Sequence, residues 1–372
     1  MILQNLRLYN FRVYPDQSFV FDKNLNIIYG DNGSGKTSLL EAIHVLALTK
    51  SFRVNNDRLL VRDTEPYFQV FGDFIDDAQV PHTVNVNYQK NEGKKVFWDR
   101  QTLDKKTDIV GKIPLIILSP ATQRITEGGP AIRRDFMNRI IAQVNPQYFL
   151  ALLDYKRRIF QRNRLLSEYS SKGQFQYTEY LEALDDLILQ SADVLHAGRR
   201  EFIERFSPLF QERFRDIYHN RQQLGIQIHY NGYPNCNDSY RDTLQKRLKR
   251  KIKSDIHFMR TSCGPHLDHL VIQMDDREIR QVASQGEHKV VLVALKMAES
   301  RILERYLDEA VIFLLDDLFA MLDLRHCMNI VNEISQHNQT FITTTDYHSL
   351  QGYGIQGKDS NINVLQLPVG EA

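Results

Sequence analysis

Cysteine is scarce in this 372-residue sequence and is nowhere paired at short range. The three cysteines, Cys236, Cys263 and Cys327, lie far apart, and no CxxC motif or zinc-finger spacing of cysteine and histidine is present. The pattern argues against a disulfide framework and against a structural zinc site. It favours a protein of the reducing cytosol.

Long apolar runs and an excess of one charge are also lacking. Runs such as Ile113–Leu118 and Val311–Leu315 have the length of a strand, and none approaches the roughly 18 residues of a membrane span. Met1 leads directly into an alternating strand pattern, so we expect no signal peptide. Lys and Arg number 47 against 46 Asp and Glu, and this net charge of +1 argues neither for nor against a nucleic-acid partner.

Hydrophobic periodicity divides the chain into three zones. Residues 1–120 alternate strand-like runs with turns around one helix, which extends from Lys36 to about Thr49. Residues 121–256 are mainly helical, and residues 257–372 alternate strands with helices. We therefore predict an α/β domain, formed by residues 1–120 and 257–372, that is split by a helical insertion of residues 121–256.

The expected strands are Met1–Tyr9, Ser18–Tyr29, Tyr67–Phe74, Thr83–Tyr88, Lys94–Trp98, Ile113–Leu118, Val271–Met274, Val311–Leu315 and Thr340–Thr344. The further helices are Pro146–Tyr169, Tyr177–Phe206, Tyr240–Ile256, Gln285–Tyr306 and Leu324–His337.

The most specific motif is a glycine-rich loop between a strand, Leu25–Tyr29, and the helix that begins at Lys36. It fits the pattern G-x-x-x-x-G-K-[ST] with Gly30, Asp31, Asn32, Gly33, Ser34, Gly35, Lys36 and Thr37. Glycines let the backbone curl so that N–H groups face phosphate oxygens at a helix N-terminus. We expect Lys36 to bridge the β- and γ-phosphates of ATP and the Thr37 hydroxyl to bind Mg²⁺.

An apolar strand, Val311–Leu315, ends in two acidic residues. A phosphate loop needs a second magnesium ligand and a group that orients the attacking water. Asp316 is the candidate for the ligand, and Asp317 is the candidate for positioning or deprotonating the water. Together with Lys36 they form the predicted catalytic set.

A second turn that suits an anion opens the apolar helix at residues 285–306. Ser284, Gln285 and Gly286 combine a hydroxyl, free N–H groups and the positive end of a helix dipole. One nucleotide does not need two phosphate loops. We therefore expect this turn to contact the γ-phosphate of ATP bound to another copy of the chain, so that two subunits enclose two nucleotides.

These three motifs together resemble the ABC-type ATPases of the SMC kind, and other strings narrow the resemblance to the RecF family. The strings are Leu8-Tyr9-Asn10-Phe11-Arg12, Leu39 to Ile43 with Ser51-Phe52-Arg53, Gly128-Gly129-Pro130 with Arg133-Arg134, Gln161-Arg162-Asn163 with Leu165-Leu166, Thr261 with Gly264-Pro265-His266, and Leu322-Asp323. The resemblance spans nearly the whole chain. It implies an ABC-type P-loop ATPase head, a mixed sheet with helices, that carries an inserted helical domain.

The resemblance also implies a function. It indicates a cytoplasmic protein of recombinational repair that dimerises on ATP, binds double-stranded and gapped DNA without sequence specificity, and hydrolyses ATP slowly under stimulation by DNA. The implied partners are RecO-, RecR- and RecA-type proteins, with RecA loaded at single-stranded gaps. By position, the resemblance makes Arg12 and Arg53 candidates for nucleotide contacts and places Asp323 in a loop facing the partner subunit of a homodimer.

Four residues depart from the family pattern, namely Ala121, Leu267, His288 and Met321. None of them removes a phosphate-binding or metal-binding group. Two other classes stay open. Met321 and His288 are compatible with an SMC-like structural head of negligible ATP turnover. The other class is the ATPase subunit of a membrane transporter. Two features argue against it, namely the long helical insertion and the lack of a clear switch histidine after residues 343–345.

The near-zero net charge is an average over two unlike parts. Residues 121–255 hold 23 Lys and Arg against 16 Asp and Glu, a net of +7, and the remaining residues hold 24 against 30, a net of −6. The insertion is therefore the predicted DNA-binding part, because helical basic runs follow phosphate backbones without reading bases. The candidate DNA contacts are Lys156, Arg157, Arg158, Lys249, Arg250 and Lys251.

Overall fold

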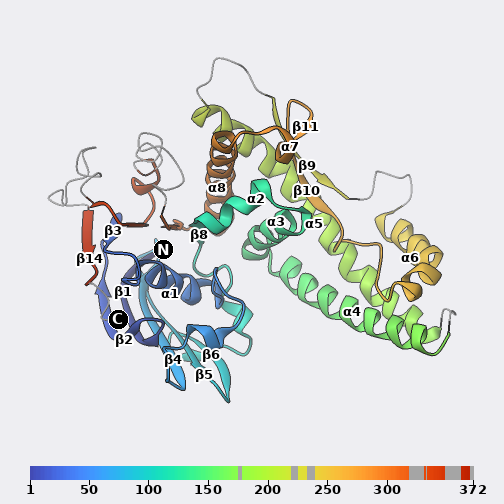
Figure 1. Ribbon diagram of the computed structural model, residues 1–372, viewed down its shortest axis with the longest axis horizontal. Coiled ribbons are helices and arrows are strands. Elements are labelled where there is room, and N and C mark those ends of the chain that lie inside the picture. The colour runs from blue at the N-terminus through green and yellow to red at the C-terminus, as the bar shows by residue number, and fades with distance from the viewer. Residues whose placement is uncertain are drawn as a thin grey trace. The chain divides into compact units, whose positions relative to one another are not determined.

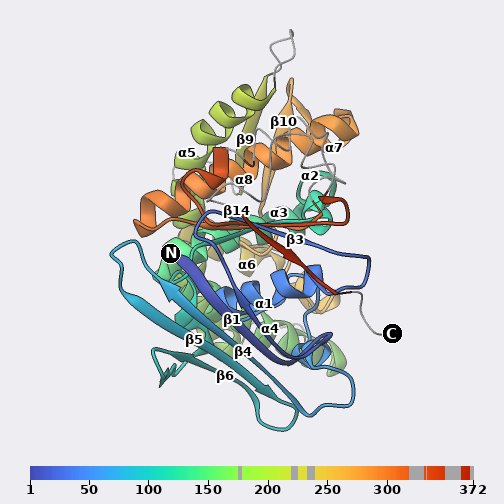
Figure 2. The same cartoon turned by 90° about the vertical axis from the view of Figure 1, so that its left-hand side faces the viewer.

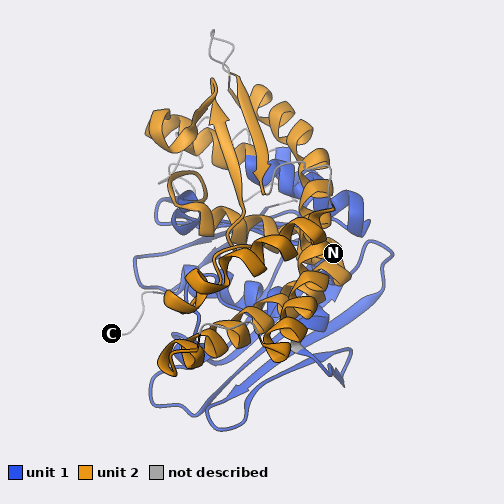
Figure 3. Cartoon of the chain, turned by 90° about the vertical axis from the view of Figure 1, so that its right-hand side faces the viewer, with its two compact units in different colours: residues 1–124, 295–372 blue, residues 125–294 orange. Residues whose placement is uncertain are grey.

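The computed structural model describes residues 1–174, 178–218, 225–232, 239–317, 331, 333–347 and 362–368. They form two compact units (Figure 3): unit 1 comprises residues 1–124 and 295–372, and unit 2 comprises residues 125–294. Within the described ranges, no helix is long and apolar enough to cross a membrane.

Unit 1 contains an antiparallel sheet of six strands in the order β2-β1-β4-β5-β6-β7 (Figure 2). The strands are β1 (Ile2–Phe11), β2 (Tyr14–Val20), β4 (Tyr67–Ile75), β5 (Pro81–Gln89), β6 (Gly93–Trp98) and β7 (Gln101–Thr102). Burial alternates along β4, where Phe68, Val70 and Phe74 face the core. The period of two shows that one face of this sheet is packed and the other is not.

The second sheet of unit 1 is parallel and has the order β14-β3-β13-β12-β8. Its strands are β3 (Leu25–Tyr29), β8 (Leu115–Leu118), β12 (Ile312–Leu315), β13 (Thr340–Thr344) and β14 (Ile362–Gln366). Residues of β8, β12 and β13 are buried along the whole strand, as expected for the interior of a parallel sheet. Because the strands are parallel, their carboxyl ends meet at one edge, where ligands bind in open α/β sheets.

Helix α1 (Lys36–Leu48) packs between these two sheets, with contacts to β1, β4 and β5 on one side and to β13 on the other. Every residue from Ser38 to Ala47 is buried, which is typical of a helix covered on all sides. The helix therefore joins the sheets into one core and holds the loop that precedes it in a defined position (Figure 1).

Unit 2 combines helices with a small antiparallel sheet of order β11-β10-β9. Its elements are α2 (Arg124–Glu127), α3 (Pro130–Val144), α4 (Pro146–Ser171), α5 (Glu179–Ile217), β9 (Ile226–Asn231), α6 (Tyr240–His257), β10 (His269–Met274), β11 (Arg277–Glu278) and α7 (Ile279–Val282). The long helix α8 (Gln285–Leu307) begins in unit 2 and ends in unit 1.

Most expected elements lie where periodicity predicts them, but several differ. The helix expected at Tyr177–Phe206 is α5, which continues to Ile217, and β14 was not expected. The single strand expected at Ser18–Tyr29 is wrong, because β2 ends at Val20 and β3 begins at Leu25 in the other sheet. Strand β9 lies inside the segment that was expected to be helical, and it pairs with β10 over six residues. The helix expected at Leu324–His337 falls largely outside the described residues.

The pairing of β9 with β10 also explains where the units divide. Residues 257–294 belong with unit 2 because β10 is a partner of β9 and not of the parallel sheet. The divisions therefore fall at residues 124/125 and 294/295, whereas the sequence predicts them at 120/121 and 256/257.

A buried arginine connects three helices of unit 2. Arg162 of α4 donates from Nε to Oδ1 of Asp185 on α5 at 2.6 Å and from Nη1 to Oδ2 of Asp255 on α6 at 2.9 Å. The same Nη1 donates to Oγ1 of Thr261 at 3.0 Å, and all four residues are buried. Burial alone lowers the pKa of Arg162, but the two carboxylates outweigh it and hold the pKa above its ordinary value. The guanidinium therefore stays charged.

Replacing Arg162 by Ala is expected to destabilise the protein by about 3–5 kcal/mol, because Asp185 and Asp255 would remain buried without a counter-ion. Urea unfolding followed by circular dichroism measures the loss. The matched control is Arg200→Ala on α5, where the side chain is 56% exposed and the expected change is within about 0.5 kcal/mol. Equal midpoints for the two variants would show that the buried network does not support the helices.

Candidate nucleotide-binding site

The glycine-rich loop has the strained turn that its sequence predicts. Gly35 immediately precedes α1 with φ of 100°, and Gly33 has φ of 87°, both in the region that favours glycine. A Cβ on Gly35 would lie 2.6 Å from the Tyr14 hydroxyl, which donates a hydrogen bond to the Gly35 carbonyl at 3.1 Å. Neither the conformation nor the space at Gly35 admits another residue.

Lys36 folds over the loop that precedes it. Its Nζ donates to the carbonyl oxygens of Gly30 at 2.7 Å and Asp31 at 2.8 Å. Burial lowers the pKa of Lys36, while the nearby carboxylates of Asp317, Asp31 and Asp316 act in the opposite direction. The ammonium group thus lies in the hollow of the loop, where a phosphate would meet it.

Asp316 is the centre of a buried hydroxyl–carboxylate cluster at the carboxyl end of β12. Its Oδ1 accepts hydrogen bonds from Oγ1 of Thr37 at 2.9 Å and from Oγ1 of Thr343 at 2.8 Å. Burial raises the pKa of Asp316 above that of an ordinary carboxyl despite these two bonds. The backbone N–H of Asp317 donates to the same Thr343 hydroxyl at 3.0 Å, which fixes the turn after the strand.

A pocket of about 310 Å³ joins the loop to this acidic cluster. It is lined by Val13, Asn32, Gly33, Gly35, Lys36, Thr37, Ser38, Arg53, Asp316, Asp317, Thr343 and Thr345, all from unit 1. Oxygen ligands of the kind that Mg²⁺ prefers, the Thr37 hydroxyl and the Asp316 carboxylate, lie side by side in it. The buried hydroxyl of Ser34, in the same loop, has no hydrogen-bond partner among the described residues. These features fit a magnesium-bound nucleotide phosphate.

The two arginines proposed as nucleotide contacts have different positions. Arg53 lines the pocket. Arg12 instead forms a bidentate ion pair with the fully buried Glu41 of α1, at 2.8 and 2.9 Å, and Glu41 also accepts from the Ser51 hydroxyl. Among the described residues, the pocket is lined by Val13 but not by its neighbour Arg12. The structure thus gives Arg12 a role in holding α1.

Sequence reasoning missed Thr343 and Thr345 as site residues. Both follow from β13 lying between β3 and β12, an order that periodicity does not reveal. The available signal was the run of three consecutive threonines, residues 343–345, at the end of β13.

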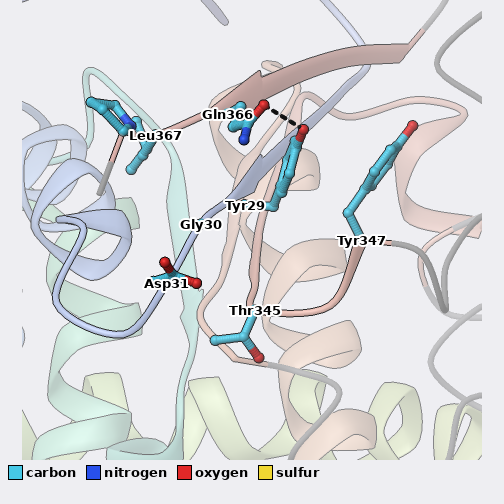
Figure 4. Close-up of a pocket in the computed structure, with 8 residues that line it drawn as sticks. Tyr29, Gly30, Asp31, Thr345, Tyr347, Gln366 and Leu367 are labelled. Carbon is cyan, nitrogen blue, oxygen red and sulfur yellow. Dashed lines mark hydrogen bonds between the residues drawn. The ribbon is translucent and has the colours of Figure 1, made fainter. Parts of the chain in front are cut away.

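A second pocket, of about 480 Å³, is lined by residues of β3, β14 and the start of the loop (Figure 4). It shares Thr345 with the first pocket. The rings of Tyr29 and Tyr347 stack in it with centroids 5.0 Å apart, and the Tyr29 hydroxyl donates to Oε1 of Gln366 at 2.9 Å. Tyr29 and Gln366 come from the paired strands β3 and β14, so this wall supports the strand from which the loop emerges.

The signature turn belongs to unit 2. Ser284 is exposed, and its hydroxyl and backbone N–H both donate to Oε2 of Glu287, at 2.8 and 2.7 Å. The Glu287 N–H donates back to the Ser284 hydroxyl at 3.3 Å, which completes a capping box at the start of α8. The hydrogen bonds from Ser284 lower the pKa of Glu287, so its carboxylate is charged. Asp323, expected near the partner subunit, lies outside the described residues, as does Met321.

The candidate DNA contacts separate into two groups. On α4, Arg157 and Arg158 are bound by the carboxylate of Asp154, at 2.8 and 3.5 Å, and both Lys156 and Arg157 are exposed. On α6 the apolar residues face inward, and one exposed face carries the basic side chains Lys246, Lys249, Arg250 and Lys253. Lys251 is half-buried, and Lys249 contacts Glu182 at 3.0 Å. The basic face of α6 is therefore the denser positive surface of the two.

The parallel sheet, the phosphate loop before α1 and the acidic end of β12 define an ABC-type P-loop ATPase head. Residues 2–364 match the family described as the RecF/RecN/SMC N terminal domain. The chain belongs to this family and, within it, to the RecF proteins, as its curated relatives show.

Two of these relatives are named DNA replication and repair protein RecF. The one from Salinibacter ruber is 35% identical over 326 residues, which cover 87% of this chain and 79% of the relative. The one from Chlorobium phaeobacteroides is 31% identical over 350 residues, 93% of this chain and 96% of the relative. The resemblance to the RecF family, which was predicted from short sequence segments, is therefore confirmed along nearly the entire chain.

Solved structures agree with this assignment. A structure of the recombination mediator protein RecF with ATP in the RecFOR pathway superposes with a TM-score of 0.86 at 27% identity, covering 93% of this chain and 92% of the other. An Smc head bound to the C-terminal winged-helix domain of ScpA gives a TM-score of 0.52 at 14% identity, covering 93% and 90%, which shows the shared fold alone. The predicted fold class is confirmed.

Lys36→Ala is expected to abolish nucleotide binding, because the loop would lose the positive charge at its centre. Binding of a fluorescent ATP analogue measures the loss, which we expect to exceed about 100-fold, or 2.7 kcal/mol. The matched control is Lys50→Ala, an exposed lysine two residues after α1, which should bind as the parent protein does. Unchanged binding by the Lys36 variant would contradict the assignment of the pocket.

Proposed function

We propose that the protein is an ATP-dependent DNA-binding protein of recombinational repair. In this proposal it is cytoplasmic, dimerises on ATP, binds DNA at single-strand gaps and junctions, and helps RecO- and RecR-type proteins to load a RecA-type protein. ATP hydrolysis is slow, is stimulated by DNA and acts as a switch. The observation that carries the proposal is the pocket in which Lys36, Thr37 and Asp316 meet, in a chain of the RecF family.

The central residues of the pocket each have a task in the proposed reaction. Lys36 neutralises the β- and γ-phosphate oxygens, and the N–H groups of Gly33 to Lys36 surround them. Thr37 and Asp316 would hold Mg²⁺, which supplies charge neutralisation between those phosphates. Asp317 orients the attacking water from the turn after β12.

The dimer depends on Ser284 in our proposal. It stands exposed at the N-terminus of the 23-residue helix α8, where its hydroxyl and N–H already bind one anionic group, the carboxylate of Glu287, which a γ-phosphate would replace. A γ-phosphate bound to one subunit and contacted by the partner's turn would favour the dimer only when ATP is present. To move the equilibrium from 1:99 to 99:1, ATP must favour the dimer by about 5.5 kcal/mol.

Ser284→Arg is expected to leave nucleotide binding intact and to abolish ATP-dependent dimerisation, because a long side chain replaces the hydroxyl that faces the phosphate. Analytical sedimentation with and without ATP measures dimerisation, and the fluorescent analogue measures binding. Gln281→Arg, an exposed position three residues earlier, adds the same charge outside the turn and should dimerise normally. ATP-dependent dimers of the Ser284 variant would refute the role of the turn.

The basic face of α6 supports the DNA part of the proposal. Lys246, Lys249, Arg250 and Lys253 recur on one side of an 18-residue helix, and Leu244 and Leu248 anchor the opposite side. Such a row is suited to phosphates and not to base edges. The affinity is therefore expected to depend strongly on salt and weakly on base sequence.

If six phosphates are neutralised, log K should fall with a slope of about −5 against log salt concentration. Replacing Lys246, Arg250 and Lys253 together by Ala is expected to make this slope shallower by about 3. Fluorescence anisotropy of duplex and gapped DNA over a salt series gives both slopes. Replacement of three exposed lysines of unit 1, Lys23, Lys50 and Lys90, is the control. An unchanged slope in the α6 variant would exclude this face.

The overall function is tested by the ATPase rate with and without gapped DNA, measured beside ATP-dependent sedimentation. Stimulation by DNA together with dimerisation supports the switch. Dimerisation and DNA binding without ATP hydrolysis would instead indicate an SMC-like structural head, which is the second candidate function. His288, one of the departures from the family pattern, is buried, and its Nδ1 has no hydrogen-bond partner among the described residues.

A further inference from the structure

The turn that follows α1 contributes one side chain to the nucleotide pocket, that of Arg53. The side chain is exposed and lines the pocket. Burial raises the pKa of Asp316, and the charge of Arg53 acts in the opposite direction, so Arg53 lies near the acidic end of the pocket. Within the described ranges, its guanidinium forms no hydrogen bond or ion pair with another residue. A guanidinium in this position is available to phosphate oxygens, which it binds strongly.

The hydroxyl of Ser51 fixes the backbone at Arg53. Its Oγ accepts hydrogen bonds from the backbone N–H of Arg53 at 2.8 Å and from that of Val54 at 2.9 Å. Bonds from a serine to the N–H groups two and three residues later close a tight turn. The Ser51 hydroxyl donates its own proton to Oε1 of Glu41. One donor and two acceptor sites are the full capacity of a hydroxyl, so Ser51 is held in a single orientation.

Glu41 connects this turn to α1. It is fully buried and lies four residues after Thr37, on the same face of the helix and one turn further along. Its Oε1 also accepts from Nη2 of Arg12 at 2.9 Å, and its Oε2 accepts from Nε of Arg12 at 2.8 Å. The bidentate ion pair fixes the plane of the carboxylate and thereby the direction in which it receives the Ser51 proton.

The remainder of the turn is held without Ser51. The N–H of Thr49 donates a hydrogen bond that closes the end of α1. The ring of Phe52 packs on the core of unit 1 and meets the ring of His44 edge-on, with centroids 5.4 Å apart. Removing the Ser51 hydroxyl therefore releases the backbone of Arg53 while the two ends of the segment stay in place.

We propose that Glu41 and Ser51 are positioning residues of the nucleotide site. Glu41 orients the Ser51 hydroxyl, and that hydroxyl holds the backbone of Arg53 so that the guanidinium meets the phosphates of ATP. Neither Glu41 nor Ser51 is among the described residues that line the pocket, so both act through Arg53. Arg12 acts one step further back, as the counter-ion of Glu41. This role rests on the proposed function, since the pocket must bind ATP for Arg53 to meet phosphates.

The first test is the affinity for a fluorescent ATP analogue. Ser51→Ala is expected to weaken binding about tenfold, because Arg53 is no longer held toward the phosphates. Ser51→Thr keeps the hydroxyl and should restore the parent affinity. The matched control is Asn56→Ala. Asn56 caps the next turn by accepting from the N–H of Arg58 at 3.0 Å, and no described residue of that turn lines the pocket, so this variant should bind normally.

The lysine of the loop separates the two levels of the proposal. Parent-like binding by Ser51→Ala, in a protein whose Lys36→Ala variant binds no nucleotide, would overturn the positioning role and leave the pocket assigned. Parent-like binding by Lys36→Ala would overturn the pocket itself. Circular dichroism verifies that each variant is folded.

A double-mutant cycle tests whether Ser51 acts through Arg53 or only stabilises the fold. Arg53→Ala alone is expected to weaken binding about tenfold, and the double variant with Ser51→Ala should also lose about tenfold instead of about a hundredfold. Urea unfolding of the same variants measures stability, where the loss caused by Ser51→Ala should be the same in both backgrounds. A hundredfold loss of affinity in the double variant would show that Ser51 acts independently of Arg53 and would overturn the proposal.

Glu41 is tested in the same cycle. Glu41→Gln keeps the size of the side chain and removes the charge that pairs with Arg12 and orients Ser51. It is expected to weaken ATP binding in the parent and to have no further effect in the Arg53→Ala background. An equal loss of affinity in both backgrounds, or no loss in either, would overturn the role of Glu41.

Discussion

The candidate site depends on one buried carboxylate. Asp316 accepts hydrogen bonds from Thr37, at the start of α1, and from Thr343, at the end of β13, so three segments far apart in the chain converge on it. A buried charge is costly unless its oxygens are hydrogen-bonded. Burial nevertheless raises the pKa of Asp316, which shows that the two hydroxyls compensate only in part. A divalent cation beside Thr37 would supply the remaining positive charge.

Basic residues of unit 2 have three distinct uses, which a charge count does not separate. Arg162 is buried and holds three helices together. Lys246 and Arg250 stand on the exposed face of α6, and Arg157 and Arg164 form ion pairs with Asp154 and Glu168 along α4. The net charge of +7 over residues 121–255 therefore exceeds what is presented to DNA at one place. The charge count treats all of these residues alike, although only Arg157 and Arg250 among them were predicted DNA contacts.

How far the sequence predicts the structure differs between elements for physical reasons. The loop from Gly30 to Thr37 is predictable because its turn requires glycines and its chemistry requires Lys36. Strand β9 is not, because Ile226 and Ile228 form too short an alternation to stand out between long helices. Arg12 was assigned to nucleotide by resemblance, yet its partner Glu41 lies on a helix face that only packing reveals.

The same limit applies to pairing between distant strands. Thr343 becomes a site residue because β13 lies between β3 and β12, and the order of strands in a sheet is a tertiary property that local periodicity does not contain. The exposure of single side chains on α5 is a tertiary property as well. Tyr180 and Leu187 look like core residues by spacing alone, and exposure distinguishes them.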